Sequence, residues 1–252
     1  MSHSFGTFVW YELNTTDLEA ATRFYGAVTG WTFDGSTEGP HAYPHIRGSQ
    51  GHLGGVTRLQ DAAKAMGAPP HWMGYVAVAD VDATLAKAKL MGGQVYFGPM
   101  DLPGTGRFAV VADPQGAAFA LYHAAKEEAP RDPRQPGEFN WHELATSDPQ
   151  AAFAFYSELF GWEKLSEMDM GPMGTYLIFG QGAVQMGGMF RRPPDLPVSA
   201  WLYYVMVTDL DAALQRATAG GAKLLNGPMD VPGGARIVQM QDPQGALFAL
   251  VG

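Results

Sequence analysis

The chain of 252 residues contains no cysteine. Disulfides, thiolate nucleophiles, iron–sulfur clusters and cysteine-ligated zinc sites all depend on that side chain. The sequence therefore excludes all four, and any catalysis or metal binding must use other residue types.

Charged residues are scarce, and basic residues are scarcer than acidic ones. They make up 16% of the chain, and 16 Lys and Arg against 25 Asp and Glu leave a formal net charge of −9. Binding to nucleic acid or to an anionic membrane needs clustered positive charge, so we expect neither partner. Because we find neither a long apolar run nor a signal-peptide pattern, we expect a cytoplasmic protein.

An internal repeat dominates what the sequence does contain. Residues 72–123 align without a gap on residues 201–252, and 25 of these 52 positions are identical. Such self-similarity predicts two homologous modules, residues 1–124 and 139–252. The segment 125–138 between them is charged and rich in proline, which is typical of a semi-rigid linker.

Each half repeats once more within itself. A strand-like run, an aspartate and an alanine-rich helical stretch occur four times, with the aspartates at Asp17, Asp80, Asp148 and Asp209. Aspartate is a favoured helix N-cap, and the strand-like sequence after each helix is broken by turn signals such as Pro-Gly and Asp-Pro-Gln-Gly. The pattern predicts an α+β fold of four βαβββ units, two per module.

Several motifs together resemble the vicinal oxygen chelate superfamily. They are the Phe-Tyr pairs ending at Tyr25 and Tyr156, the Asp-Pro-Gln-Gly turns starting at Asp113 and Asp242, and the doubled Trp-x-Glu-Leu. The superfamily includes glyoxalase I, bleomycin and fosfomycin resistance proteins and extradiol dioxygenases, and the doubled motif is similar to a two-module bacterial glyoxalase-like subgroup. The resemblance implies that the βαβββ units of each module form a curved sheet around a cup. It does not fix an activity, because the superfamily contains lyases, oxygenases, transferases and binding proteins.

The resemblance also implies where metal ligands would stand, and these positions carry none. Here they hold Trp10, Met73, Ala120, Trp141, Leu202 and Ala249. These side chains lack the oxygen or imidazole nitrogen that such a metal needs. We therefore expect no metal at the usual site, and no cofactor.

Strand alternation assigns another set of side chains to the cups. The inward residues that we predict as ligand-binding are Trp10, Met73, Tyr75, Tyr122, Trp141 and Tyr204, with His52 and Gln185 at matched polar positions. An apolar cup with few polar groups is typical of a small-molecule site. The same aromatic side chains could instead simply fill the cups.

Glu12 and Glu143 are the predicted catalytic or anchoring residues. Both share the strand face of the preceding tryptophan, and an inward carboxylate needs a partner. Arg107 and Arg236 are candidates for a structural ion pair and are included among the ligand-binding residues. The alternatives are a carboxylate that recognises a ligand and a general base.

The leading functional hypothesis is a metal-independent binder of a planar or aromatic metabolite or antibiotic. One alternative is an enzyme, such as a glyoxalase-like lyase or a dioxygenase or hydroxylase, with a displaced metal site or a Glu-based mechanism. Another is an interaction protein whose cups are vestigial. A monomer or weak homodimer is expected, because a two-module chain can form internally the pairing that single-module relatives make as dimers.

Overall fold

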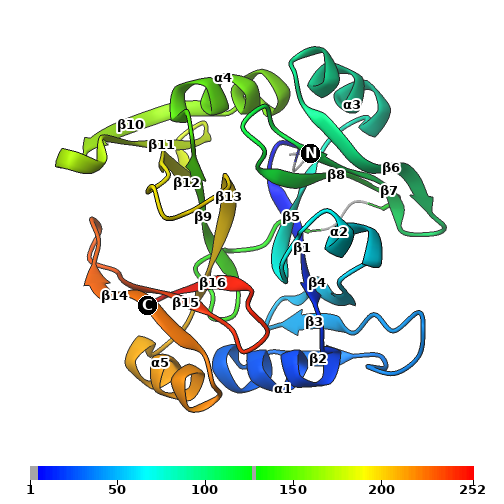
Figure 1. The fold of residues 1–252 in the computed structure, drawn as a ribbon, viewed down its shortest axis with the longest axis vertical. Coiled ribbons are helices and arrows are strands. Elements are labelled where there is room, and N and C mark those ends of the chain that lie inside the picture. The colour runs from blue at the N-terminus through cyan, green and yellow to red at the C-terminus, as the bar shows by residue number, and fades with distance from the viewer. Residues whose placement is uncertain (1–4, 127–128) are drawn as a thin grey trace. The chain divides into compact units, whose positions relative to one another are not determined.

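The structure is a computed structural model that describes residues 5–126 and 129–252. Residues 1–4 of the predicted first module and residues 127–128 of the predicted linker lie outside this description. The elements of the first half are β1 (Phe8–Thr15), α1 (Leu18–Thr29), β2 (Thr32–Asp34), β3 (His45–Gly48), β4 (Gly51–Arg58), α2 (Asp61–Ala65), β5 (His71–Ala77), α3 (Val81–Leu90), β6 (Gln94–Leu102), β7 (Gly106–Ala112) and β8 (Ala118–Ala124) (Figure 1).

The second half repeats this order of strands. Its elements are β9 (Phe139–Thr146), α4 (Pro149–Phe160), β10 (Glu163–Asp169), the 3₁₀ turn η1 (Gly171–Met173), β11 (Thr175–Gln181), β12 (Val184–Arg191), β13 (Ala200–Met206), α5 (Leu210–Ala219), β14 (Lys223–Asp230), β15 (Arg236–Gln241) and β16 (Leu247–Val251). The strands form two eight-stranded sheets, ordered β2-β3-β4-β1-β5-β8-β7-β6 and β10-β11-β12-β9-β13-β16-β15-β14. The two orders correspond strand for strand, which confirms the predicted α+β fold of two repeated modules.

The four aspartates begin the four long helices as predicted. In α1, α3, α4 and α5 the carboxylate preceding the helix accepts a hydrogen bond from the backbone N–H three residues on, at 2.9–3.1 Å. This contact satisfies one of the donors that a helix N-terminus leaves unpaired. Gly30 and Gly161 end α1 and α4 in the left-handed conformation that glycine adopts without strain.

Packing groups the residues into two compact units, each of which takes one βαβββ segment from each half. Unit 1 holds the described parts of residues 1–9 and 74–130 together with 141–201, and unit 2 holds 10–73, 131–140 and 202–252. In unit 2 helices α1 and α5 lie side by side (Figure 1), and in unit 1 α3 contacts α4.

A buried hydrogen-bonded chain of tryptophan, tyrosine and aspartate links the two halves inside each unit. In unit 2 the Trp72 indole donates to the Tyr25 hydroxyl at 2.9 Å, and that hydroxyl donates to Asp242 at 3.0 Å. Unit 1 repeats the chain with Trp201, Tyr156 and Asp113. Burial raises the pKa of Asp113 and of Asp242. The Phe-Tyr and Asp-Pro-Gln-Gly motifs thus have a structural role.

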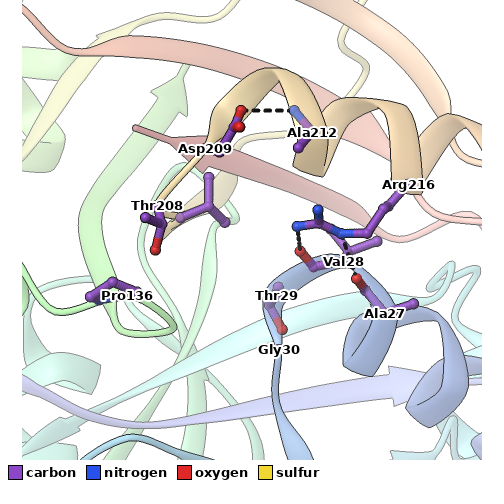
Figure 2. A pocket seen from close by; sticks show the side chains of 10 residues that line it. Ala27, Val28, Thr29, Gly30, Pro136, Thr208, Asp209, Ala212 and Arg216 are labelled. Atoms are coloured by element: carbon purple, nitrogen blue, oxygen red, sulfur yellow. Dashed lines mark hydrogen bonds between the residues drawn. The ribbon is translucent and has the colours of Figure 1, made fainter.

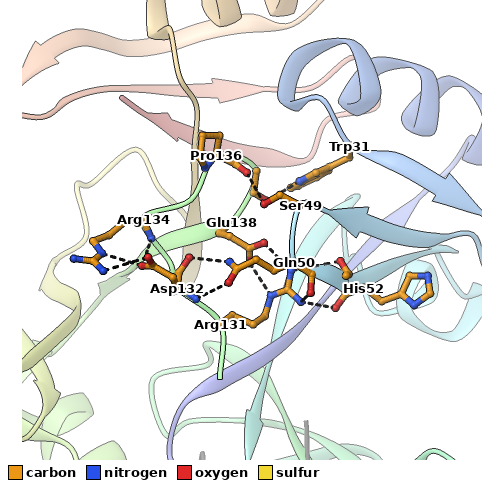
Figure 3. Close-up of polar contacts among 11 residues, drawn as sticks. Trp31, Ser49, Gln50, His52, Arg131, Asp132, Arg134, Pro136 and Glu138 are labelled. Carbon is orange, nitrogen blue, oxygen red and sulfur yellow. Dashed lines mark hydrogen bonds and ion pairs between the residues drawn. The ribbon is translucent and has the colours of Figure 1, made fainter. Parts of the chain in front are cut away.

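Residues 131–138, at the end of the predicted linker, belong to unit 2 and form hydrogen bonds with other parts of it (Figure 3). The Arg131 guanidinium makes two hydrogen bonds, of 2.6 and 2.7 Å, with the Glu138 carboxylate, whose side chain is only 4% exposed. Arg131 also donates to the His52 carbonyl at 2.9 Å, and the Trp31 indole donates to the Gly137 carbonyl at 2.7 Å. This part of the segment is therefore held by specific contacts to the β3–β4 turn and to Trp31.

In the described parts of the chain, we find no helix that combines the length and the apolar character needed to cross a membrane.

Candidate functional site

A hydrogen-bonded triad of tryptophan, tyrosine and glutamate lies on β1 and the segment before β3. The Trp10 indole donates to the Tyr43 hydroxyl at 3.0 Å, and the Tyr43 hydroxyl donates to Glu12 Oε2 at 2.9 Å. All three side chains are half-buried. The predicted residues Trp10 and Glu12 are therefore brought together by a tyrosine that the sequence interpretation did not include.

The same triad is built a second time, in unit 1. The Trp141 indole donates to the Tyr176 hydroxyl at 2.9 Å, and the hydroxyl donates to Glu143 Oε2 at 2.9 Å. Burial, with the negative charge of Glu143 as a smaller cause, raises the pKa of Tyr176 far above its usual range. The hydroxyl consequently stays protonated at any physiological pH and acts as a fixed donor to the carboxylate.

A glycine in the neighbouring strand makes room for each tyrosine ring. Glu12 is in register with Gly55 of β4, and Glu143 with Gly188 of β12. A Cβ at Gly55 would overlap the Tyr43 ring, and one at Gly188 would overlap the Tyr176 ring. In both halves the tyrosine precedes this glycine by twelve residues, 43 to 55 and 176 to 188, and this shared spacing is the sequence signal that could have identified it.

The two faces of β1 differ as strand alternation predicts. Tyr11 and Leu13 are buried, and the Tyr11 ring stacks on Phe139 with centroids 3.7 Å apart. Trp10 and Glu12 alternate with these residues and are half-buried. Anchoring of a ligand by Glu12 and Glu143 remains a prediction.

The two arginines named as candidate partners of Glu12 and Glu143 form hydrogen bonds with aspartates instead. Arg107 makes hydrogen bonds to Asp82 at 2.7 and 2.9 Å and to Asp101 at 2.8 Å. Arg236 bonds Asp211 at 2.9 Å. The hairpin register explains the pair of Arg107 with Asp101, because Asp101 on β6 stands opposite Arg107 on β7.

Other predicted ligand-binding residues occupy separate places. In unit 1, Tyr75 and Tyr122 contact each other edge to face with centroids 6.4 Å apart, and Tyr122 donates to the Thr105 carbonyl at 2.9 Å. In unit 2, Met73 is 8% exposed and Tyr204 is 2% exposed. Gln239 donates to the Tyr204 hydroxyl at 2.6 Å.

His52 and Gln185 hold matching strand positions but differ in their surroundings. His52 Nε2 lies 2.7 Å from Asp34 Oδ2, and the His52 ring lies 5.4 Å from that of His45. Gln185 is exposed on β12.

The usual metal-binding positions of the resembled superfamily do not fit a metal in this chain. Their residues offer indole, thioether and alkyl groups, none of which is a ligand for Zn²⁺, Mn²⁺ or Fe²⁺ at such a site. Across residues 5–126 and 129–252, no group of three or more His, Asp or Glu is placed to hold a metal ion.

Each unit also has a surface pocket at its helix ends. In unit 2 a pocket of about 500 Å³ is lined by the end of α1, the start of α5 and Pro136 (Figure 2). There Arg216 donates to the carbonyls of Ala27 and Val28 at 2.7 and 3.1 Å. The described lining of this pocket and of its counterpart in unit 1 includes no predicted site residue.

Comparison with known proteins identifies the family. Residues 7–121 and 138–250 each match the family described as Glyoxalase/Bleomycin resistance protein/Dioxygenase superfamily. The chain belongs to this superfamily. It is 33% identical over 256 residues to a Mycobacterium tuberculosis protein named "Putative glyoxylase CFP32", and the alignment covers 98% of this chain and 94% of that protein. It is 32% identical over 259 residues to the anthracycline biosynthesis protein DnrV of Streptomyces peucetius, covering 98% and 93%.

Solved structures share the fold of this superfamily member. The Mn(II)-bound glyoxalase from Novosphingobium aromaticivorans superposes with a TM-score of 0.68 at 17% identity, covering 98% of this chain and 82% of that one. Homoprotocatechuate 2,3-dioxygenase from Brevibacterium fuscum gives a TM-score of 0.70 at 14% identity, covering 98% and 80%. At this identity the likeness concerns the fold alone.

Proposed function

We propose that this superfamily member binds planar aromatic small molecules without a metal, at two sites built on its Trp–Tyr–Glu triads. The observation that carries the proposal is the repetition of the same triad in both halves, with hydrogen bonds of 2.9–3.0 Å throughout. A merely space-filling role for the tryptophans does not require an ordered carboxylate beside each of them.

The chemistry of the triad suits a flat ligand that carries a hydroxyl or amine. A half-buried indole offers an aromatic surface for stacking, and a carboxylate accepts a charge-assisted hydrogen bond. The tyrosine hydroxyl, which bonds both neighbours, fixes the positions of the indole and the carboxylate before a ligand arrives. Such preorganisation lowers the entropy that binding costs.

The name of one relative supports the same class of ligand. Anthracyclines are polycyclic aromatic compounds with hydroxyl groups, and one relative is named for their biosynthesis. A simple probe of this class is 2-hydroxyanthraquinone, which is planar and carries its hydroxyl away from the carbonyls, so it does not chelate metals well.

Replacing Glu12 and Glu143 together by Gln should weaken binding of this probe by about 10- to 100-fold, or about 1.5–3 kcal/mol. The amide keeps the shape but loses the charge that accepts the ligand hydrogen bond. Calorimetric titration measures the effect, and Glu19→Gln on the exposed face of α1 is the matched control, expected to bind like wild type. Unchanged affinity in the double variant, or no binding to wild type, would contradict the proposal.

A further inference from the structure

The two triads resemble each other, but their neighbours do not. On β3, His45 is in register with Asp34 of β2 and with Gly55 of β4. At the corresponding place Ile178 is in register with Ser166 and Gly188. Because His52 likewise corresponds to Gln185, the first half carries an aspartate and two histidines where the second half carries Ser166, Ile178 and Gln185.

Successive side-chain contacts connect the aspartate and the two histidines of the first half to the first triad. Asp34 Oδ2 lies 2.7 Å from His52 Nε2, and Arg47 bonds the same oxygen at 2.7–2.8 Å. The His45 ring lies 5.4 Å from the His52 ring and 5.2 Å from the Tyr43 ring, centroid to centroid.

His45 also contacts the triad's aromatic surface directly. Its ring stands edge to face against Trp10 with centroids 6.0 Å apart. It is exposed, so both a ligand stacked on Trp10 and solvent can reach it.

The surroundings of His45 favour its neutral form. Partial burial lowers the pKa of His45, and the positive charge of His52 adds to this effect, while Asp34 opposes it. Hydrogen bonds from His52 and Arg47 lower the pKa of Asp34, which is therefore ionised at neutral pH. The other charged groups at this place are Glu12 of the triad and Arg131, which bonds the His52 carbonyl.

We propose that the first half carries a proton-transfer site, with His45 as the base and His52 and Asp34 behind it, and that the second half only binds. This proposal rests on the proposed function, because the ligand that loses the proton is the one held at the Trp10–Tyr43–Glu12 triad. The substrate class is a planar aromatic compound with an acidic hydroxyl.

The step itself is a simple ionisation of that hydroxyl. The neutral His45 imidazole takes the proton, so the ligand O–H bond breaks and an N–H bond forms. The bonding electron pair stays on oxygen, which gives a phenolate and an imidazolium. The imidazolium passes its proton to solvent, and no oxidant or reductant takes part.

The test is a pH titration of bound 2-hydroxyanthraquinone, whose visible absorption shifts when the hydroxyl ionises. For wild type we expect two components, one of which ionises about tenfold more readily than the other. His45→Phe should remove the easily ionised component, and His52→Gln should weaken it. The matched control Ile178→Phe, in the second half, should leave both components in place.

Affinity measured at a pH where the probe is neutral separates this proposal from the proposed function. The control Ile178→Phe should bind the neutral probe within about threefold of wild type. If wild type does not bind the probe, the proposed function fails and this proposal fails with it. If wild type binds but His45→Phe titrates identically, only the proton-transfer site is overturned.

Discussion

Replacing Arg131 by Met should lower the free energy of unfolding by about 3–5 kcal/mol, because it leaves a buried carboxylate without its counter-ion. Glu138 is 4% exposed at its side chain, and both of its oxygens accept hydrogen bonds from the Arg131 guanidinium (Figure 3). The same guanidinium also donates to carbonyls of the β3–β4 turn, and those bonds are lost as well.

Urea unfolding of wild type and variant measures this loss. Arg134→Met is the matched control. Arg134 lies three residues after Arg131 and also pairs with an aspartate, Asp132, but its side chain is 81% exposed. Exposed ion pairs contribute up to about 1 kcal/mol, so the control should unfold nearly as wild type does. Equal effects of the two substitutions would show that the buried pair does not stabilise unit 2.

Lowering the pH from 7 to 4 should remove about 3 kcal/mol of stability through His142 alone. The side chain is 7% exposed, its ring stacks on Phe8 at 4.2 Å, and its Nδ1 lies 2.7 Å from the Met186 carbonyl. Burial lowers the pKa of His142 from 6.5 to about 4. Between these values the unfolded chain binds a proton that the folded chain does not, so stability falls as the pH falls through this window.

The comparison that isolates this group is His142→Asn against wild type at pH 7 and at pH 4. The variant is less stable at pH 7, but it should lose about 3 kcal/mol less than wild type on acidification, since it has no imidazole to protonate. A wild-type pH dependence in His142→Asn would contradict the assignment.

Features that depend on local sequence could be predicted well. The four aspartates act within one helical turn of their own position, so the capping pattern was sufficient to place four helices. Strand alternation likewise separates Trp10 and Glu12 from Tyr11 and Leu13, because neighbouring side chains of a strand point to opposite faces.

Features that depend on pairing between distant strands could not be predicted in the same way. Tyr43 lies 31 residues from Glu12 and Tyr176 lies 33 from Glu143, so only the register of the strands shows that their side chains meet. Arg107 was a candidate partner of a glutamate, because the sequence does not show that Asp101 faces it across a hairpin. The histidine cluster of the first half could not be predicted for the same reason, because Asp34, His45 and His52 come from three different strands.

The most direct test of metal-independent binding is the affinity for 2-hydroxyanthraquinone before and after exhaustive dialysis against a chelator, with the metal content measured on the same samples. The superfamily's usual metal positions carry no ligand side chain here, and the Trp–Tyr–Glu triads need no metal to accept a hydroxyl. We expect the same Kd, within error, in both samples and after zinc, manganese or iron is added back. Binding that disappears with the chelator and returns with one of these metals would contradict it.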